Sequence, residues 1–377
     1  MNLKIKLSKK DGIFFAVIAI ICGGLFFIPA PQQLTKQTGI REKAEVLAVD
    51  NSDLQVQGLI RFGSQCLKVK IVTGPYRGQT FDASNEIRGQ LELDKQFKVG
   101  DKAVVVYHGD SLQKNTILTA QDYDRNTWTF ILITLFCLLL CVFGRWTGVK
   151  ALFSFVFSCF MIWKVIVPLV LRGFPASWTI FACVVLLTAV IMFLIAGFTR
   201  KGLSAFAGAI TGVFAGLLMA NLFTRLMQVN GATLPYSQTL LYSGYQSINL
   251  QDIFIGAMIL AASGAVMDLA MDIASGVEEV AHHNPKLSRK ELTASGLRQG
   301  RSVVGTMTTT LLLAYSGGYI TLLMVFCAQG NTPMDFINNP LVAAEMVKTL
   351  IGSFSLILVA PFTAFASGWI FKKSNVQ

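Results

Sequence analysis

The chain has 377 residues, of which 53% are hydrophobic and only 14% are charged. Soluble globular proteins carry roughly 25% charged residues, so this composition excludes an ordinary soluble protein. The formal net charge of +11 does not indicate a nucleic-acid partner. The basic residues flank apolar segments, as in membrane proteins, whereas a nucleic-acid-binding protein gathers them on a folded face.

The N-terminal segment, 1–11, is rich in lysine and is followed by an apolar run over 12–30. A signal peptide has this order of segments, but its apolar region covers only about 7–15 residues. We therefore predict an uncleaved transmembrane helix over 12–30 and a cytoplasmic N-terminus over 1–11.

Residues 31–125 form the longest polar part of the chain. Short alternating runs, separated by turn signals such as Gly74-Pro75 and Gly100-Asp101, are typical of β-strands. The runs are 44–49, 66–72, 79–83 and 102–108. We predict a small antiparallel, barrel-like β domain whose strand order the sequence does not determine.

The remainder, 126–371, contains apolar runs about as long as the roughly 20 residues with which a helix crosses a bilayer. We predict spans at 126–144, 150–171, 177–198, 203–225, 252–274, 303–327 and 349–371. Together with 12–30 they make about eight transmembrane helices. The predicted fold class is an α-helical multipass membrane protein with a small extracytoplasmic β domain.

The positions of lysine and arginine predict the orientation of these spans. If the spans number eight, the basic clusters of the short loops all fall on one side of the membrane. The clusters are the lysines of 1–11, Arg145 and Lys150, Arg200 and Lys201, the basic residues of 286–301, and Lys372 and Lys373. Since basic loops stay in the cytoplasm, both termini, including the tail 372–377, are expected there. The β domain is then expected outside a bacterial cytoplasmic membrane.

The span 252–274 carries two carboxylates, Asp268 and Asp272. Residues four apart lie on the same face of a helix, and an acidic side chain at the centre of a span costs about 2.5–3.5 kcal/mol. The pair therefore predicts a cation or proton site, or part of a solute path. The alternative is structural: Asp272 lies at the membrane surface, and Asp268, one turn deeper, bonds to neighbouring hydroxyl groups.

The next span, 303–327, has hydroxyl groups in its first half, at Thr306, Thr309 and Thr310. We predict that these threonines line the same path; the alternative is that they bond to their own backbone or join helices. The pair Gly317-Gly318 predicts a kink or an unwound segment in this span. Before the span, Ser288 followed by Glu291 predicts a capping box at the start of a helix.

The span 203–225 carries one glycine per turn, at Gly208, Gly212 and Gly216. Small residues at this spacing allow two helix backbones to approach closely in a membrane. The row therefore predicts a helix-packing face and carries no information about a substrate.

Motifs for other chemistry are absent from the sequence, which contains no GxxxxGK[ST], HExxH, CxxC or GxSxG. We expect no cofactor and no enzymatic activity, and the sequence identifies no metal site, because His282-His283 is expected to be solvated. The expected partners are the lipid bilayer, an unidentified small solute or cation, and another copy of the chain or another membrane protein. Nucleic acid is not among them.

Several stretches of the chain resemble the YibE/F-like family of bacterial multipass proteins. They are 264–279, 295–301 and 305–315, while 72–78 and Asn85 resemble the N-terminal domain of that family. The resemblance covers most of the chain and implies a membrane location and this architecture. It implies no activity and no catalytic residue.

The acidic pair and the threonine-rich span therefore favour a transporter or channel for a small solute or ion. The alternative is a membrane-anchored binding or scaffold protein, or a receptor, that acts through the β domain. A membrane enzyme is the third class, and it lacks a visible nucleophile.

Overall fold

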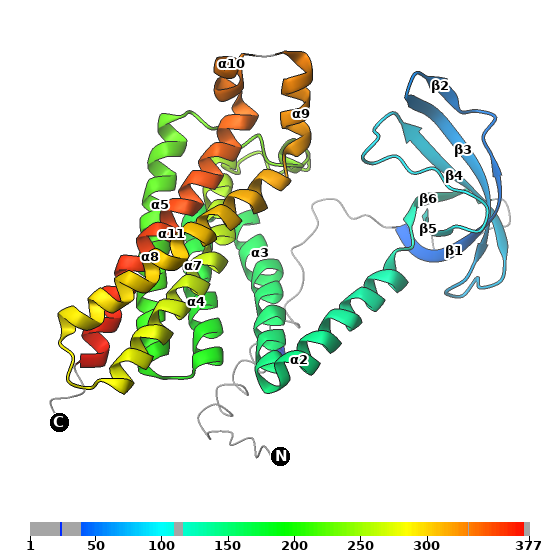
Figure 1. Ribbon diagram of the computed structural model, residues 1–377. Helices are drawn as coiled ribbons and strands as arrows, with labels where there is room; N and C mark the ends of the chain where they lie inside the picture. The colour runs from blue at the N-terminus through cyan, green and yellow to red at the C-terminus, as the bar shows by residue number, and fades with distance from the viewer. Residues whose placement is uncertain (1–22, 25–38, 109–115, 331, 373–377) are drawn as a thin grey trace. The chain divides into compact units, whose positions relative to one another are not determined.

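The computed structural model of the protein describes residues 23–24, 39–108, 116–330 and 332–372 (Figure 1). The predicted N-terminus, 1–11, and the predicted span 12–30, apart from Gly23 and Gly24, lie outside these residues, as does the tail beyond Lys372. Contacts divide the chain into two compact units, one of residues 33–139 and one made of the remainder.

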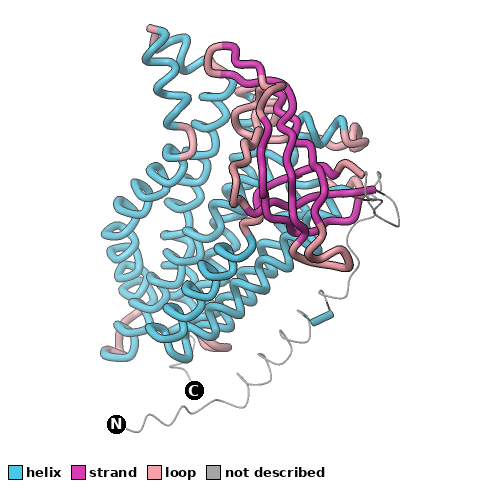
Figure 2. Tube along the Cα trace, turned by 90° about the vertical axis from the view of Figure 1, so that its right-hand side faces the viewer, coloured by secondary structure: helices cyan, strands magenta, loops and turns pink. Residues whose placement is uncertain are grey.

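The first of these units contains a small β-barrel, and Figure 2 shows that its strands curve around one another. The strands are β1 (Gly39–Asp50), β2 (Gln55–Gln57), β3 (Ile60–Ile71), β4 (Thr80–Arg88), β5 (Lys102–His108) and β6 (Leu118–Tyr123). They are hydrogen-bonded in the order β1-β5-β6-β4-β3-β2, and β1 also pairs with β3, which closes the sheet. The predicted barrel-like domain is therefore confirmed.

The strand order also shows what the sequence did not predict. With the short β2 treated as one arm of a hairpin with β3, five strands close into a barrel of the Greek-key type found in OB-folds. The pairs are antiparallel except for β4 with β6, which run parallel through Ala83 and Leu118. The prediction of a wholly antiparallel domain is wrong for this pair, because β6 was not recognised as a strand.

Two buried amides fix the segment between β4 and β5 to the barrel. Gln65, which is 0% exposed, donates to the Phe97 carbonyl and accepts from the Phe97 N–H, both at 3.0 Å. Asn85 donates to Gln65 Oε1 at 3.1 Å and to the Lys95 carbonyl at 2.6 Å. Because buried amides are stable only when they are hydrogen-bonded, this network holds the Phe97 ring inside the barrel, where it is 1% exposed.

The other unit is helical (Figure 1). Its long helices are α4 (Ala176–Ala196), α5 (Arg200–Leu226), α7 (Leu250–His283), α8 (Arg289–Gly317) and α11 (Pro340–Lys372). The shorter ones are η1 (Met161–Ile166), α3 (Val167–Leu171), α6 (Ser237–Tyr242), α9 (Ile320–Gln329) and α10 (Pro333–Asn338). The helix α2 (Asn126–Phe160) begins directly after β6 and leads into η1.

The helix α2 is broken at Arg145, whose φ of 49° and ψ of −127° are not helical. A Cβ at Gly148 would lie 2.9 Å from the carbonyl carbon of Leu140. Residues eight apart in a straight helix are separated by about 12 Å along its axis, so the chain reverses direction here. The break falls between the two predicted spans 126–144 and 150–171.

Length and hydropathy identify five described helical segments that could cross a membrane, or six if α8 and α9 form one bent span. This number is smaller than the eight predicted. The first segment, Asn126–Leu171, counts once although it covers two predicted spans, and the predicted span 12–30 lies outside the described residues. The α8–α9 bend of 68° lies at Gly317-Gly318, where the sequence predicted a kink.

Several helices extend beyond the predicted spans. The helix α7 continues to His283, and α11 begins at Pro340, well before the predicted start at 349. Hydropathy locates the apolar part of a helix, whereas the helix itself continues through charged residues that favour helical backbone. The predicted capping box is confirmed, since Ser288 and Glu291 hydrogen-bond each other's backbone at the start of α8.

The helix α11 packs against α5 through a row of glycines. Each glycine of this row faces one residue of α11, so that the two helices run antiparallel in close contact. The pairs are Gly208–Thr363, Gly212–Val359 and Gly216–Ser355. A Cβ at Gly212 would lie 2.8 Å from the Cβ of Val359 and 3.1 Å from its Cα.

The opposite side of α11 contacts α8 in the same way. Here glycines of both helices face small or short side chains of the other. The pairs are Gly296–Ala364, Gly300–Ala360 and Gly368–Thr293. Thus α11 lies between α5 and α8 at separations that larger side chains would not permit.

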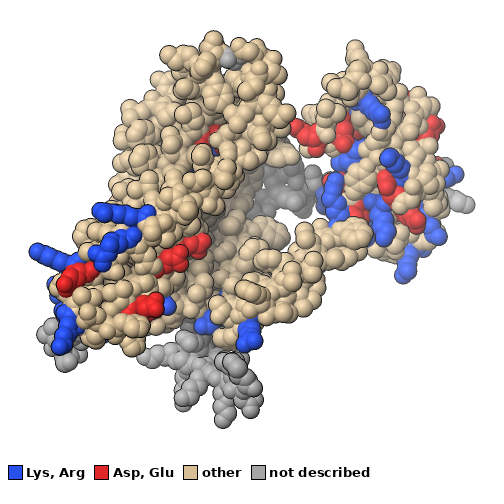
Figure 3. Space-filling model, viewed as in Figure 1, with Lys and Arg blue, Asp and Glu red and all other residues tan. Residues whose placement is uncertain are grey.

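Charged side chains of the helical unit gather at one end of it (Figure 3). This end carries the turn between α7 and α8 and the end of α11, as Figure 1 shows. The basic residues of 286–301 and Lys372 therefore lie at the same end of the unit as the start of α5.

We expect Gly212→Ala to destabilise the helical unit. The new methyl group would meet the Val359 backbone, and overpacking of this kind costs about 1–3 kcal/mol. Gly264→Ala, on α7, is the matched control, because nothing lies within 4 Å of a Cβ there. Thermal unfolding of the detergent-purified protein should show a lower midpoint for Gly212→Ala only; equal midpoints for the two variants would contradict the packing described.

Candidate functional site

The helix α7 has a buried face and an acidic face. Leu269, Ala270 and Ile273 are 0% exposed and pack into the core of the bundle. Asp268 and Asp272 lie on the opposite, exposed face, one turn apart. The two predicted carboxylates therefore share a face, and this face is not covered by the other described helices.

Asp268 and Asp272 have no charged partner in the described part of the chain. Neither carboxylate forms a salt bridge or accepts a hydrogen bond from a described residue, although the Asp272 carbonyl accepts from Gln299 Nε2 at 2.9 Å. An unpaired carboxylate at membrane depth is costly. The acidic face therefore requires water, a bound cation, a proton, or a partner that covers it.

The predicted hydroxyl groups of α8 are exposed and bond to their own helix. Thr306 donates to the Val303 carbonyl at 2.9 Å, Thr309 to the Gly305 carbonyl at 3.0 Å, and Thr310 to the Thr306 carbonyl at 2.9 Å. A hydroxyl group whose hydrogen is already donated offers only lone pairs to a ligand. These three oxygens can therefore face a cation but not a second acceptor.

The predicted acidic residues of α7 and the predicted threonines of α8 do not contact each other through hydrogen bonds. Among the described residues, no hydrogen bond links Asp268 or Asp272 to the α8 threonines. The two helices are linked nearer the charged end of the bundle, where Gln299 of α8 contacts both Asp272 and Gly276 of α7.

A groove of about 280 Å³ between α8 and α11 contains Thr309 together with other hydroxyl groups. The residues that line it are Thr308, Thr309, Leu312, Thr349, Leu350, Ser353, Phe354 and Ile357. The hydroxyl groups of Thr308 and Thr349 are buried and have no hydrogen-bond partner among the described residues. An unpartnered buried hydroxyl group is unfavourable, so this groove has unused capacity for a polar group.

An ion pair on α11, close to this groove, was missed in the sequence. Lys348 Nζ lies 2.6 Å from Glu345 Oε1, and both side chains are about three-quarters buried. The Lys348 ammonium group also lies 5.8 Å from the centre of the Phe254 ring of α7, a cation–π distance. The sequence placed Lys348 in a loop, because its apolar run began one residue later; a helix start at Pro340 puts the pair inside the bundle.

A second missed residue is Lys164, which lies within the predicted span 150–171. It is half-buried in the π-helical turn η1, with its ammonium group 5.4 Å from the centre of the Trp163 ring. π-Helical turns often occur at functional sites, and a basic residue inside an apolar span is a functional candidate in its own right. The signal was available in the sequence as a lone lysine in an apolar run.

The described residues hold no cluster of three or more His, Cys, Asp or Glu side chains that could bind a metal ion. His282 and His283 are both exposed, with ring centres 5.9 Å apart. The acidic pair of α7 therefore offers two carboxylates and would need further oxygen ligands from water or another chain to complete a cation site.

Two family models cover nearly the whole chain. The model of the YibE/F-like protein family matches residues 132–373, and that of the YibE/F family N-terminal domain matches residues 40–123. The chain therefore belongs to the YibE/F-like family, and the resemblance found in the sequence is confirmed. Together with its apolar helices, this membership makes it a membrane protein. No curated protein and no solved structure matches the chain.

We expect Glu345→Gln to destabilise the protein more than the double change Glu345→Gln with Lys348→Met. The single change leaves a largely buried ammonium group without its partner, whereas the double change removes both charges. The expected loss for the single change is about 1–3 kcal/mol, less than for a fully buried pair.

The matched control is Glu86→Gln, which breaks an exposed ion pair with Arg88 on the barrel. Exposed pairs contribute about 0–1 kcal/mol, so this change should have little effect on thermal unfolding. If the single and double changes at 345 and 348 were equally mild, the ion pair would not be a buried one.

Proposed function

We propose that this member of the YibE/F-like family is a transporter or channel of the bacterial cytoplasmic membrane. It moves a small solute or ion along a path that includes Asp268 and Asp272. The observation that carries the proposal is the exposed acidic face of α7, whose carboxylates have no partner among the described residues and which follows the apolar part of the helix. A purely structural role would predict partners for these carboxylates, and the described residues supply none.

A cation is the ion that this arrangement favours. Two carboxylates one turn apart repel each other unless a positive charge or a proton lies nearby. The exposed threonine oxygens of α8 present lone pairs, which also suit a cation. Thr306, Thr309 and Thr310 would then line the path in a part of α8 that ends at the bend before α9.

The proposed topology has eight spans, with both termini in the cytoplasm and the β-barrel outside. The break at Arg145 supports two crossings within Asn126–Leu171, and the bent pair α8–α9 supports one more. The gathering of basic residues at one end of the helical unit supports a cytoplasmic position for that end (Figure 3). The predicted span 12–30 is the eighth.

The protein acts without a cofactor and is not an enzyme in this proposal. Its partners are the bilayer, the solute or cation, and a second copy of the chain or another membrane protein, but not nucleic acid. A second copy is favoured by the same acidic face, because a neighbouring subunit would shield the carboxylates from lipid.

The second candidate function is that of a binding protein or receptor which acts through the barrel. Apolar side chains are exposed at the β2–β3 hairpin, where Leu59 is 90% and Val56 is 66% exposed. Exposed apolar patches mark binding surfaces in many proteins, and barrels of the OB type bind ligands through strand faces and loops.

We expect Asp268→Asn to fold normally and to reduce transport at least about tenfold, because a carboxylate that faces a cation contributes several kcal/mol. The purified protein in liposomes should be tested with a panel of monovalent and divalent cations. Thermal unfolding reports binding at the same time, since a ligand at 100 times its Kd stabilises by about 2.7 kcal/mol.

Glu279→Gln is the matched control, because Glu279 is an exposed acid on the same helix beyond the pair. It should retain both transport and stabilisation by the cation. If Asp268→Asn moved every cation that wild type moves, at the same rate, the carboxylate would not lie on the path.

Removal of residues 35–122 separates the two candidate functions. A transporter should retain flux in liposomes without the barrel, since the acidic face belongs to the helical unit. If the shortened chain inserts and remains stable but has lost all flux, the barrel takes part in function directly and the receptor hypothesis gains.

A further inference from the structure

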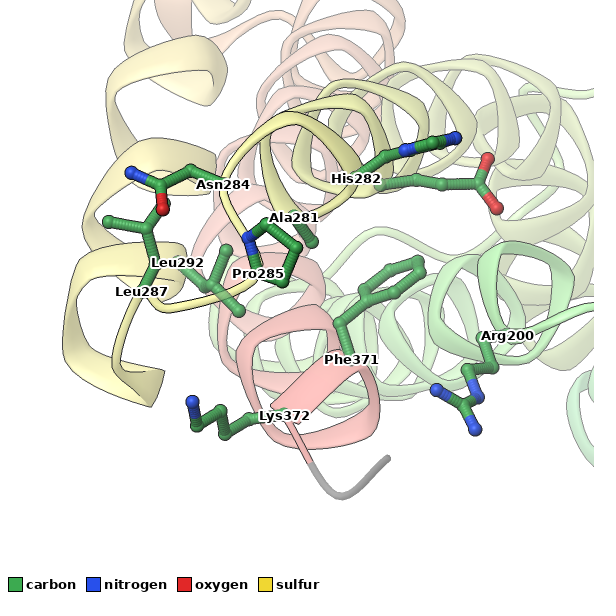
Figure 4. A pocket seen from close by; sticks show the side chains of 10 residues that line it. Arg200, Ala281, His282, Asn284, Pro285, Leu287, Leu292, Phe371 and Lys372 are labelled. Carbon is green, nitrogen blue, oxygen red and sulfur yellow. The ribbon is translucent and has the colours of Figure 1, made fainter. Parts of the chain in front are cut away.

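A pocket of about 360 Å³ lies at the charged end of the helical unit (Figure 4). Four segments far apart in the sequence meet there: the start of α5, the end of α7, the turn into α8, and the end of α11. The residues that line it are Arg200, Glu278, Ala281, His282, Asn284, Pro285, Leu287, Leu292, Phe371 and Lys372. The pocket is separate from Asp268 and Asp272.

The rim of the pocket carries an excess of positive charge. Figure 4 shows Arg200 and Lys372 on opposite sides of the Phe371 ring. Neither forms a salt bridge with a residue that the structure describes. The acid of the pocket, Glu278, is already engaged by Lys201, whose Nζ lies 3.4 Å from its carboxylate.

The nearest other acid is committed to a helix cap. Hydrogen bonds from the Ser288 N–H and hydroxyl group lower the pKa of Glu291, and the charge of Lys372 lowers it further. Glu291 therefore remains ionised and bound at the start of α8. It moderates the charge of Lys372 but does not pair with it, so the positive field of the pocket persists.

The floor of the pocket is apolar. It consists of Ala281, Leu287, Leu292 and Phe371, of which Leu292 is only 3% exposed. A bare inorganic anion makes no use of such a floor, whereas a phosphate group attached to glycerol and acyl chains would cover it. Arginine and lysine are the side chains that recognise phosphate groups, and basic pockets at the cytoplasmic ends of spans suit anionic headgroups.

We propose that this pocket binds a phosphate group, with Arg200 and Lys372 as its charged ligands and the headgroup of an anionic phospholipid as its source. The bound headgroup connects the start of α5 with the end of α11, beside the end of α7. It thereby couples the start of α8 to the lipid composition of the surrounding leaflet.

The test uses the full-length protein in an uncharged detergent at constant ionic strength. The probes are phosphatidylglycerol, phosphatidylcholine and inorganic phosphate, and the readout is the concentration that gives half of the maximal rise in unfolding temperature. Phosphatidylglycerol should stabilise wild type, and phosphatidylcholine should not. Each of Arg200→Gln and Lys372→Gln should weaken the effect about fivefold, and the double variant about 25-fold.

Two matched variants accompany these. Arg298→Gln removes an exposed charge of α8 that does not line the pocket, and it should respond as wild type does. Arg200→Lys keeps the charge and should retain most of the response. Both variants show whether a loss comes from the pocket or from net charge alone.

Stabilisation by phosphatidylglycerol alone supports a lipid headgroup, and stabilisation by both phosphatidylglycerol and inorganic phosphate supports a phosphate site that also accepts the free anion. The proposal is overturned if neither probe stabilises wild type, or if the double variant responds to phosphatidylglycerol within about twofold of wild type. Because the readout is thermal stability, this result does not depend on whether the protein transports a cation.

Discussion

The close approach of α11 to both α5 and α8 is the contact on which the helical unit depends. In a bilayer, apolar side chains gain little by leaving lipid for protein, so helices associate through backbone proximity and tight packing. Glycine at 208, 212 and 216 provides that proximity on one side of α11, and glycine at 296 and 300 provides it on the other. The positions of α7 and α8 at the charged end follow from this arrangement.

This packing also determines which side chains remain uncovered. With α5, α4 and α11 against its buried face, α7 leaves Asp268 and Asp272 outside the bundle. The helix α8 packs on α11 through its glycines, which leaves Thr306 and Thr310 exposed and Thr309 at the groove between the two helices. The positions of the small residues determine how the helices pack, and the packing determines which polar side chains remain exposed.

Much of the architecture could be predicted from the sequence because it depends on local patterns. Apolar runs predict the apolar helices, and the four-residue spacing of Asp268 and Asp272 predicts their shared face. The pair Gly317-Gly318 predicts the bend between α8 and α9. The features that were missed depend on other parts of the chain. The strand β6 is recognisable only through its pairing with β4 and β5, and the start of α11 at Pro340 lies outside the apolar run on which the prediction was based.

The missed ion pair shows the same limit at the candidate site. In the sequence, Lys348 stands at the edge of an apolar run and looks like a loop residue. Only when the helix extends back through Glu345, three residues earlier, do the two side chains lie on the same face and pair. The cation–π contact with Phe254 joins residues far apart in the sequence, which no local pattern reports. Lys164 differs, because its position in an apolar run was visible and only its π-helical turn was not.

Apart from the charged end, the bundle carries two pairs of charged residues, Asp268 with Asp272 and Glu345 with Lys348, at different levels along its axis. At about 1.5 Å per residue, Asp268 lies roughly 22 Å from the charged end of α7, and Lys348 lies roughly 36 Å from the charged end of α11. Because both helices end in the same charged region, the acidic pair and the ion pair occupy different levels along the bundle. The hydroxyl groups of Thr308 and Thr349, which have no hydrogen-bond partner among the described residues, lie in the groove between α8 and α11. Thr349 follows Lys348 directly in α11 and therefore lies at the level of the ion pair. The two pairs are therefore separate features of the bundle, and the bend at Gly317-Gly318 joins α8, which lines the groove beside the second pair, to α9.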